Sequence, residues 1–191
     1  MSDSSSTLTR RGFVSAAMAA ALTAVPAAPI YARTPGFLRG AGDIRRLHMY
    51  SARTGEFIDI IYWIDGEYVT EALREINYFM RDWRENAVIA MNPRNFDTLA
   101  AVHRLVDTRE PYLLLSGYRT PRTNAMLRRR SRGVAKNSYH IKGMASDIRL
   151  KSRSIDQIYR AALACRAGGV GYYRRSQFVH MDCGPVRTWR R

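Results

Sequence analysis

Apolar and polar residues alternate along the chain between residues 47 and 69. Two β-rich runs, 47–51 and 56–63, are separated by turn residues at 53–55, and Asp65-Gly66 marks a second turn before a short third run. A period of two with turn residues between the runs is typical of neighbouring antiparallel strands. The pattern predicts a β-hairpin or a small meander.

Helical spacing replaces this alternation in the next two segments. Apolar residues recur three and four positions apart over residues 70–83, where Thr70 occupies the expected N-cap position. The same spacing returns after Pro93 and continues to Val106. We therefore expect two amphipathic helices after the hairpin.

Short strands and helices alternate in the second half of the chain. Apolar runs predict strands at 112–115, 145–150, 170–173 and 178–182, the last two as a hairpin. Helical spacing predicts a short basic helix at 123–132 and another at 155–167, which Gly168-Gly169 would close. The sum predicts an α+β domain over residues 45–191, with helices packed on a mainly antiparallel sheet.

The first 32 residues have the pattern of an export signal. Arg10-Arg11 is followed by Phe13 and an Ala-rich apolar run to about Ala28. This run contains Pro26 and falls short of the roughly 20 residues that span a bilayer, which argues against a membrane anchor. We expect a twin-arginine signal peptide cleaved after Ala32, an extended lead-in at 33–44, and a mature protein in the periplasm without a membrane span.

The net charge of the chain indicates what kind of partner it binds. The chain has 31 Lys and Arg against 16 Asp and Glu, a net charge of +15, which predicts an anionic partner. Export argues against nucleic acid. A basic run, Arg128–Arg132 with Lys136 beyond it, could capture an acidic polymer, although most charge runs are solvated faces.

The two cysteines narrow the class of protein further. Cys165 and Cys183 are too few for a disulfide-dense scaffold or a four-cysteine zinc site. Export would permit a bridge between them, while burial as apolar fillers is the alternative. The sequence leaves both open, and any metal site must use His and carboxylate ligands.

The two densest polar segments of the chain, 138–147 and 178–182, supply such ligands. A catalytic zinc site needs three His or carboxylate ligands and one open position, and His140, Asp147 and His180 fit that need. A single His or Asp near a strand end is more often structural. However, two of the four histidines lie in these two segments, which favours a metal site.

Two further residues are candidates for the chemistry. Asp182 could take a proton from the attacking water and return it to the departing amine. It could instead orient His180 or pair with an arginine. Arg119 follows a predicted buried strand and suits a substrate carboxylate or a developing oxyanion, with a solvated arginine as the alternative.

These motifs together resemble a known family. Ser-x-His-x-x-Gly-x-Ala-x-Asp at 138–147, the later His180 and the earlier Ser116-Gly117-Tyr118-Arg119 are similar to the zinc D-Ala-D-Ala peptidases of the LAS type. Segments 81–84, 131–136, 168–173 and 178–185 resemble the exported branch similar to murein endopeptidase K. The resemblance extends from about residue 45 to Trp189.

The resemblance implies a fold, a reaction and residue roles. The fold would be the α+β hedgehog/D-Ala-D-Ala peptidase-like fold, and the substrate would be peptidoglycan. One zinc ion would be bound by His140, Asp147 and His180, while Arg119 would hold substrate or polarise the scissile carbonyl, and Ser138 would support substrate binding. The reaction would be that of a D,D-endopeptidase on cross-links or of a carboxypeptidase on stem peptides, a choice that the sequence leaves open.

One position departs from the family pattern. Carboxypeptidases and dipeptidases of this superfamily usually have an acidic base three residues before the last histidine, where this chain has Gln177. Asp182 is the nearest acidic substitute and is our candidate base. The competing hypothesis from a different class is a non-catalytic exported basic domain that binds an acidic cell-wall polymer.

Overall fold

The strands predicted between residues 47 and 69 form one edge of an eight-stranded sheet. In the computed structural model, which describes residues 42–191, β1 (Ile44–Ser51), β2 (Phe57–Ile64) and β3 (Glu67–Tyr68) form an antiparallel meander. The predicted signal peptide lies outside the described residues, as do residues 33–41 of the predicted lead-in. β1 begins at Ile44, the last residue assigned to that lead-in.

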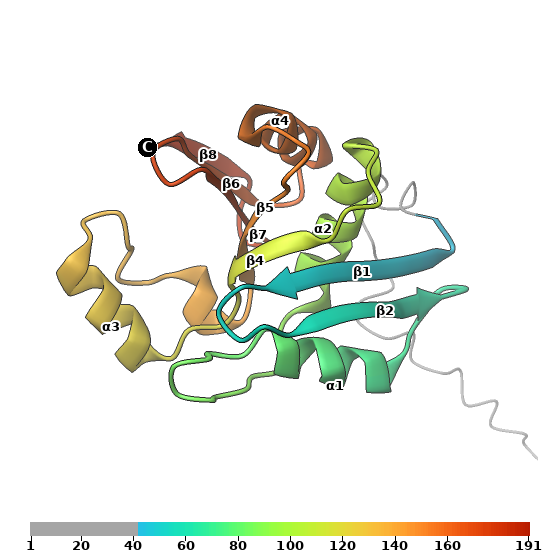
Figure 1. Cartoon of the computed structure of the whole chain (residues 1–191), viewed down its shortest axis with the longest axis horizontal. Coiled ribbons are helices and arrows are strands. Elements are labelled where there is room, and N and C mark those ends of the chain that lie inside the picture. Colours follow the sequence, from blue (N-terminus) through green and yellow to red (C-terminus); the bar gives the residue numbers. More distant parts are fainter. Residues whose placement is uncertain (1–41) are drawn as a thin grey trace, which may run out of the picture.

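The remaining strands extend the sheet in the order β3-β2-β1-β4-β5-β7-β6-β8 (Figure 1). They are β4 (Tyr112–Ser116), β5 (Ala145–Arg149), β6 (Gly169–Tyr173), β7 (Phe178–Asp182) and β8 (Arg187–Arg190). Neighbouring strands are antiparallel except for the parallel pairs β1–β4 and β6–β8. This arrangement confirms the α+β class and the mainly antiparallel sheet.

Helices cover one face of this sheet. α1 (Thr70–Phe79) packs on β2, α2 (Pro93–Leu105) packs on β1 and β7, and α4 (Ile155–Cys165) packs on α2, β6 and β7. α3 (Pro121–Arg130) stands apart from the sheet (Figure 1). The core lies between the sheet and the packed helices, and Met49, Phe96 and Met181 are fully buried in it.

A buried polar network ties the meander to α2. The Asp97 carboxylate accepts hydrogen bonds from the hydroxyls of Tyr62 at 3.2 Å and Tyr68 at 2.6 Å. Arg45 forms an ion pair with the same carboxylate at 2.7 Å. Because a buried charge is costly unless it is paired, this network fixes how β1, β2 and β3 sit on the helix.

Several predicted helix boundaries were wrong. α1 ends at Phe79, not at Trp83, and Thr70 is its first residue, since the N-cap is Val69 and has no side-chain cap. α4 ends at Cys165 with Arg166 in the left-handed region, and not through Gly168-Gly169. α3 begins at Pro121, because the Thr120 side chain caps it by accepting from the Thr123 N–H.

Two further findings concern elements that the pattern did not predict. β8 is mostly exposed and polar, so it lacks the alternation that marks a half-buried strand. Residues 139–142 form a 3₁₀ turn.

Both cysteines are buried and free, which agrees with the apolar-filler interpretation rather than with a disulfide. Within residues 42–191, none of the helices has the length and apolar character needed to cross a membrane.

Candidate active site

One row of paired residues crosses the face of the sheet opposite the helices. In the strand register Ser116 pairs with Asp147, Asp147 with His180, and His180 with Gly171. Gly171 pairs in turn with Trp189. Directly paired residues project to the same face, so this register brings Asp147 and His180 side by side although 33 positions separate them.

His140 reaches the same point from a different element. It lies in the 3₁₀ turn Tyr139–Lys142, where Ser138 caps the start by accepting the His140 N–H at 3.3 Å. Gly143 ends the turn with a φ of 63°, a conformation that favours glycine. This local geometry presents the His140 ring to the row on the sheet.

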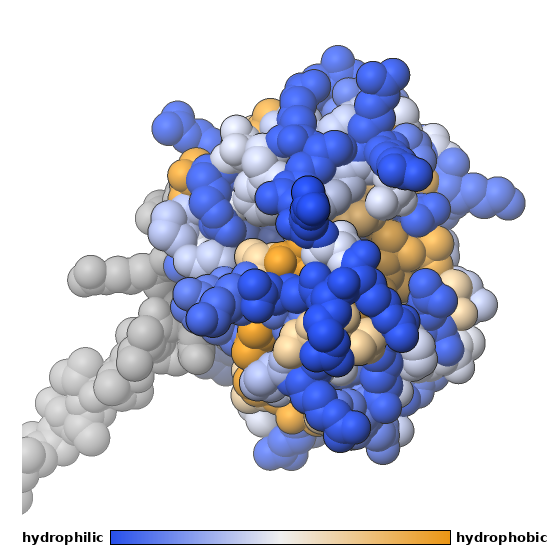
Figure 2. All heavy atoms as spheres, turned by 90° about the vertical axis from the view of Figure 1, so that its left-hand side faces the viewer, coloured by the Kyte–Doolittle hydropathy of each residue, from blue (hydrophilic) through white to orange (hydrophobic). Residues whose placement is uncertain are grey.

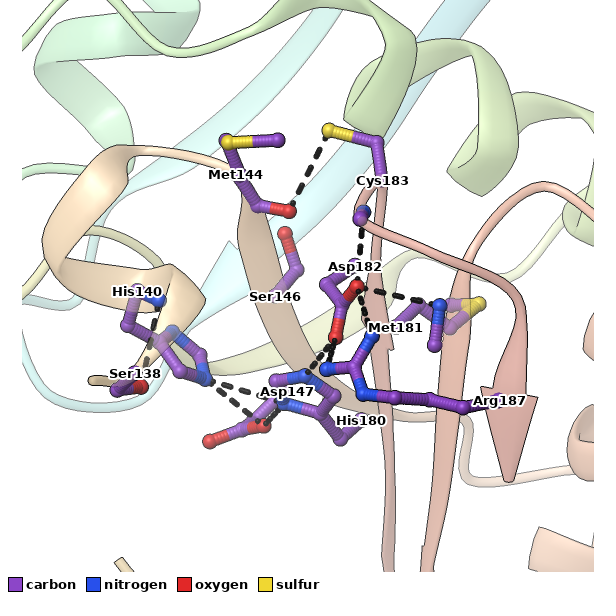
Figure 3. A network of polar contacts seen from close by, with 12 residues as sticks. Ser138, His140, Met144, Ser146, Asp147, His180, Met181, Asp182, Cys183 and Arg187 are labelled. Carbon is purple, nitrogen blue, oxygen red and sulfur yellow. Dashed lines mark hydrogen bonds and ion pairs between the residues drawn. The ribbon is translucent and has the colours of Figure 1, made fainter. Parts of the chain in front are cut away.

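The three side chains converge closely (Figure 3). His140 Nε2 lies 3.2 Å from Asp147 Oδ1 and 3.2 Å from His180 Nδ1, and His180 Nδ1 lies 2.8 Å from Asp147 Oδ1. Ligands at zinc-bond lengths in a tetrahedral site are about 3.3 Å apart. The donor set and its spacing therefore fit one divalent ion, with small adjustments.

Contacts behind the two rings orient them. His140 Nδ1 lies 2.6 Å from the Gly117 carbonyl oxygen, which can only accept, so Nδ1 carries the hydrogen and the Nε2 lone pair faces the cluster. His180 Nε2 lies 3.0 Å from Asp182 Oδ2, so its Nδ1 is the nitrogen that faces the cluster. Such outer hydrogen bonds set the tautomer of metal-binding histidines.

The electrostatics of the cluster suit a cation. Burial and the nearby Arg119 charge lower the pKa of His140 to about 4, so this ring is neutral at pH 7. Burial acts to raise the pKa of Asp147, but His140 and Arg119 outweigh it and hold that pKa well below its usual range. Burial lowers the pKa of His180, while the carboxylates of Asp147 and Asp182 raise it more strongly. A metal ion would displace the proton from His180.

Asp182 lies behind His180 and does not face the cluster. Its Oδ1 accepts from the N–H groups of Gly169 at 3.1 Å and Gly184 at 2.9 Å. Arg187 contacts both carboxylate oxygens, at 3.0 and 2.6 Å. The side chain is 1% exposed. Of the roles that the sequence left open for Asp182, the geometry favours orienting His180 and pairing with an arginine over proton transfer.

A cleft of about 500 Å³ opens in front of the cluster. Arg119 lines it, donates from Nε to Ser116 Oγ at 2.7 Å and forms an ion pair with the second oxygen of Asp147. Ser138, Tyr139, Tyr173 and Trp189 contribute to the walls. Gln177 is exposed and donates to the Arg174 carbonyl at 2.6 Å, outside the cleft. Among residues 42–191, Asp147 is the only carboxylate that lines this cleft.

Sequence reasoning missed Arg187 and the glycines that make room for it. A Cβ on Gly169 would stand 2.5 Å from Asp182 Oδ2 and 2.4 Å from Arg187 Nη1. A Cβ on Gly171 would stand 2.4 Å from the Trp189 ring. Gly168-Gly169 was a visible signal, but the pattern assigned this pair to a helix end, while residues 170–173 were correctly predicted as a strand.

Comparisons with known proteins identify the family of this chain. A family model described as peptidoglycan L,D-endopeptidase MepK matches residues 39–189. The peptidoglycan L,D-endopeptidase MepK of Escherichia coli (strain K12) is 47% identical over 145 residues, which cover 76% of this chain and 80% of that protein. The probable peptidoglycan L,D-endopeptidase MepK of Haemophilus influenzae is 41% identical over 147 residues, or 76% and 79% of the two chains. These matches confirm the resemblance to the murein endopeptidases, and the chain belongs to the peptidoglycan L,D-endopeptidase MepK family.

Proposed function

We propose that the protein is a zinc-dependent peptidoglycan L,D-endopeptidase that acts in the periplasm after twin-arginine export. One observation carries the proposal: ligand atoms of His140, Asp147 and His180 all lie within 4.8 Å of one another beside an open cleft. A closed structural site would have four protein ligands, whereas a catalytic site keeps a position open. The fold that we propose is the LAS-type metallopeptidase fold.

The names of the relatives bear on the bond that is cut. They are called L,D-endopeptidases, whereas the sequence resemblance suggested a D,D-endopeptidase or a carboxypeptidase. We therefore propose hydrolysis of an amide bond between an L- and a D-configured residue inside a peptidoglycan peptide, in place of the earlier expectation.

The predicted site residues have distinct parts in the proposed reaction. When bound by His140, Asp147 and His180, zinc would supply Lewis acidity that activates water and polarises an amide carbonyl. Arg119 is held by Ser116 and stabilises the negative charge that develops on the amide oxygen. Ser138 caps the turn that carries His140 and contributes to the substrate-facing wall.

Asp182 acts as a positioning residue in this mechanism. Its carboxylate holds the hydrogen on His180 Nε2, which keeps the lone pair of Nδ1 directed at the metal position. Burial acts to raise the pKa of Asp182, but hydrogen bonds with His180, Arg187 and the Gly184 N–H lower it below its usual range. The group therefore stays ionised and suits this role better than that of a base.

Hydrolysis of purified sacculi tests the proposal. We expect one zinc ion per chain and soluble fragments whose masses identify an L,D bond. His140→Ala and Asp147→Ala should remain folded but lose zinc and activity, while His48→Ala, which alters a histidine bonded to the Arg109 carbonyl, should behave as wild type. A protein that binds sacculi but releases no fragment at any zinc concentration would instead be the non-catalytic binding domain.

A further inference from the structure

A second, larger cavity lies on the same face of the sheet as the cluster. It is a groove of about 1040 Å³. Phe57, Tyr50, Leu113 and Arg149 line it, and each pairs with the next in the strand register across β2, β1, β4 and β5. The groove floor is therefore a second cross-strand row, parallel to the row that carries Asp147.

The groove continues the catalytic cleft. Asp147 and Arg149 are two residues apart on β5, so they project to the same face about 7 Å apart along the strand. Arg149 Nη2 donates to the carbonyl oxygen of Ser176 at 3.2 Å. Ser176 lines the cleft and Gln177 lines the groove, so Arg149 lies at the junction of the two cavities.

Arg149 has hydrogen-bonding capacity that the described chain does not use. Its Nε is buried and has no hydrogen-bond partner within residues 42–191. Glu110, the carboxylate of the groove, is instead saturated by the N–H groups of Lys151 and Ser152 and by the Ser152 hydroxyl. A buried N–H without a partner is costly. Because Nε is closed off from solvent, a ligand carboxylate would reach the guanidinium through Nη1, which makes no hydrogen bond within residues 42–191 and belongs to a side chain that lines the groove.

The walls of the groove indicate what accompanies that carboxylate. Tyr50 and Phe57 are 40% and 56% exposed, and Lys151 adds a second cation nearby. Aromatic and aliphatic surface beside a planar guanidinium suits a peptide with aliphatic side chains and a free carboxylate. An endopeptidase must also hold chain on both sides of the bond that it cuts.

We propose that this groove is a second subsite, which holds an acidic stem peptide on one side of the scissile bond through a pair between Arg149 and a free carboxylate. The inference rests on the proposed function, and it extends that function to the recognition of the substrate. The cluster and Arg119 act on the amide, and Arg149 selects the peptide that carries it.

A substrate-by-variant cycle tests the subsite. Wild type, Arg149→Gln and Arg149→Lys are compared on a cross-linked muropeptide with free carboxylates and on its amidated form. We expect amidation to lower kcat/KM of wild type about tenfold, mainly through KM, which is the scale of a charged hydrogen bond. Arg149→Gln should show the same loss on the free form and no further loss on amidation, and Arg149→Lys should recover part of it.

Controls separate this role from a structural one. Arg175→Gln removes one exposed positive charge from the β6–β7 turn, which also holds Ser176, the partner of Arg149. Arg175 lines neither cavity, so this variant should match wild type. Zinc content and the thermal midpoint should be unchanged in all variants. If Arg149→Gln distinguishes the free and amidated substrates as well as wild type does, the subsite is overturned.

Equilibrium binding keeps the subsite distinguishable from the proposed activity. Binding of an uncross-linked stem peptide with free carboxylates to the zinc-loaded enzyme does not depend on hydrolysis. We expect Arg149→Gln to weaken it about tenfold. If wild type cleaves no muropeptide but this loss is observed, the proposed function fails and the subsite stands. Equal binding by both proteins overturns the subsite.

Discussion

At the scale of single residues, the proposed metal ligands are more recognisable in the sequence than the groups that orient them. His140, Asp147 and His180 belong to residue types that bind zinc, and they occur in two dense polar segments. Arg187 is one of 31 basic residues, and nothing in its neighbours marks it. Its bidentate contact with Asp182 depends on β8 lying beside β6, which is a tertiary arrangement.

The role of Asp182 gives a prediction at this scale. Asp182→Asn keeps the shape but removes the charge that five donors share, so His180 loses its fixed orientation. We expect zinc affinity to fall 10- to 100-fold, as measured by competition with a chromogenic chelator. Arg187→Lys should cause a smaller loss. An ammonium keeps the positive charge beside Asp182 but cannot contact both carboxylate oxygens. The matched control is Arg190→Lys. Arg190 lies on β8, as Arg187 does, but its guanidinium packs on the rings of Tyr159 and Tyr172.

A different outcome would restore the first hypothesis for this residue. If Asp182→Asn binds zinc as tightly as wild type but loses turnover, with a changed acidic limb in the pH profile of kcat, its carboxylate transfers a proton. The substrate would then approach His180 from the side on which Asp182 lies.

At the scale of elements, apolar periodicity locates helices and strands but does not fix their ends. The spacing over residues 70–83 is helical to its end, yet α1 ends at Phe79. The Met80 carbonyl accepts the Tyr118 N–H at 2.8 Å, and a Cβ on Gly117 would stand 2.4 Å from the same oxygen. This contact joins segments 38 positions apart, so no local pattern could have shown it.

Asp82, which the longer helix would have included, instead anchors Thr120, the residue that follows Arg119. Its carboxylate is 1% exposed and accepts from the Thr120 N–H at 2.9 Å, the Thr120 hydroxyl at 3.1 Å and the Arg84 N–H at 3.1 Å. Burial acts to raise the pKa of Asp82, but hydrogen bonds from Thr123, Thr120 and Arg84 lower it below its ordinary value.

We expect Asp82→Asn to lower the free energy of unfolding by about 1–3 kcal/mol at pH 7, the scale of disrupted buried hydrogen bonds. Because the folded pKa is depressed, the carboxylate stabilises wild type fully above about pH 4 and loses this effect as pH falls through the folded pKa. The gap between the two proteins should therefore narrow in acid. Urea denaturation at pH 7 and at decreasing pH measures it, with the exposed Glu75→Gln as control. A gap that does not change with pH would contradict the electrostatic account.

At the scale of the whole molecule, the two faces of the sheet have different roles. Its helix-covered face holds the core, and its other face carries both the cluster and the groove. The alternation of side chains on β5 predicts that Asp147 and Arg149 share a face, and the sequence allowed that inference. It did not predict that six other strands would complete two parallel rows, because strand order is set by long-range pairing.

The basic surface beside the cleft gives the last prediction. Arg128, Arg129 and Arg130 end α3, are exposed and have no carboxylate partner within residues 42–191. Figure 2 shows hydrophilic side chains over much of this side of the molecule. Stem peptides carry free carboxylates, so these cations should speed encounter with sacculi. The α3 helix stands away from the packed sheet, which leaves its charges available to a large polymer (Figure 1).

Replacing the three arginines with Gln should lower kcat/KM on sacculi about tenfold at low salt and leave kcat unchanged, since capture precedes hydrolysis. The difference should vanish near 1 M salt, where the Debye length is about 3 Å. A triple Gln replacement of the exposed Arg74, Arg109 and Arg160 removes the same charge elsewhere and should cost much less. Equal losses in both triple variants would show that net charge, and not the position of α3 beside the cleft, governs capture. A loss that persists in 1 M salt would mean that the α3 arginines contact substrate directly, in which case the cleft extends over α3 during catalysis.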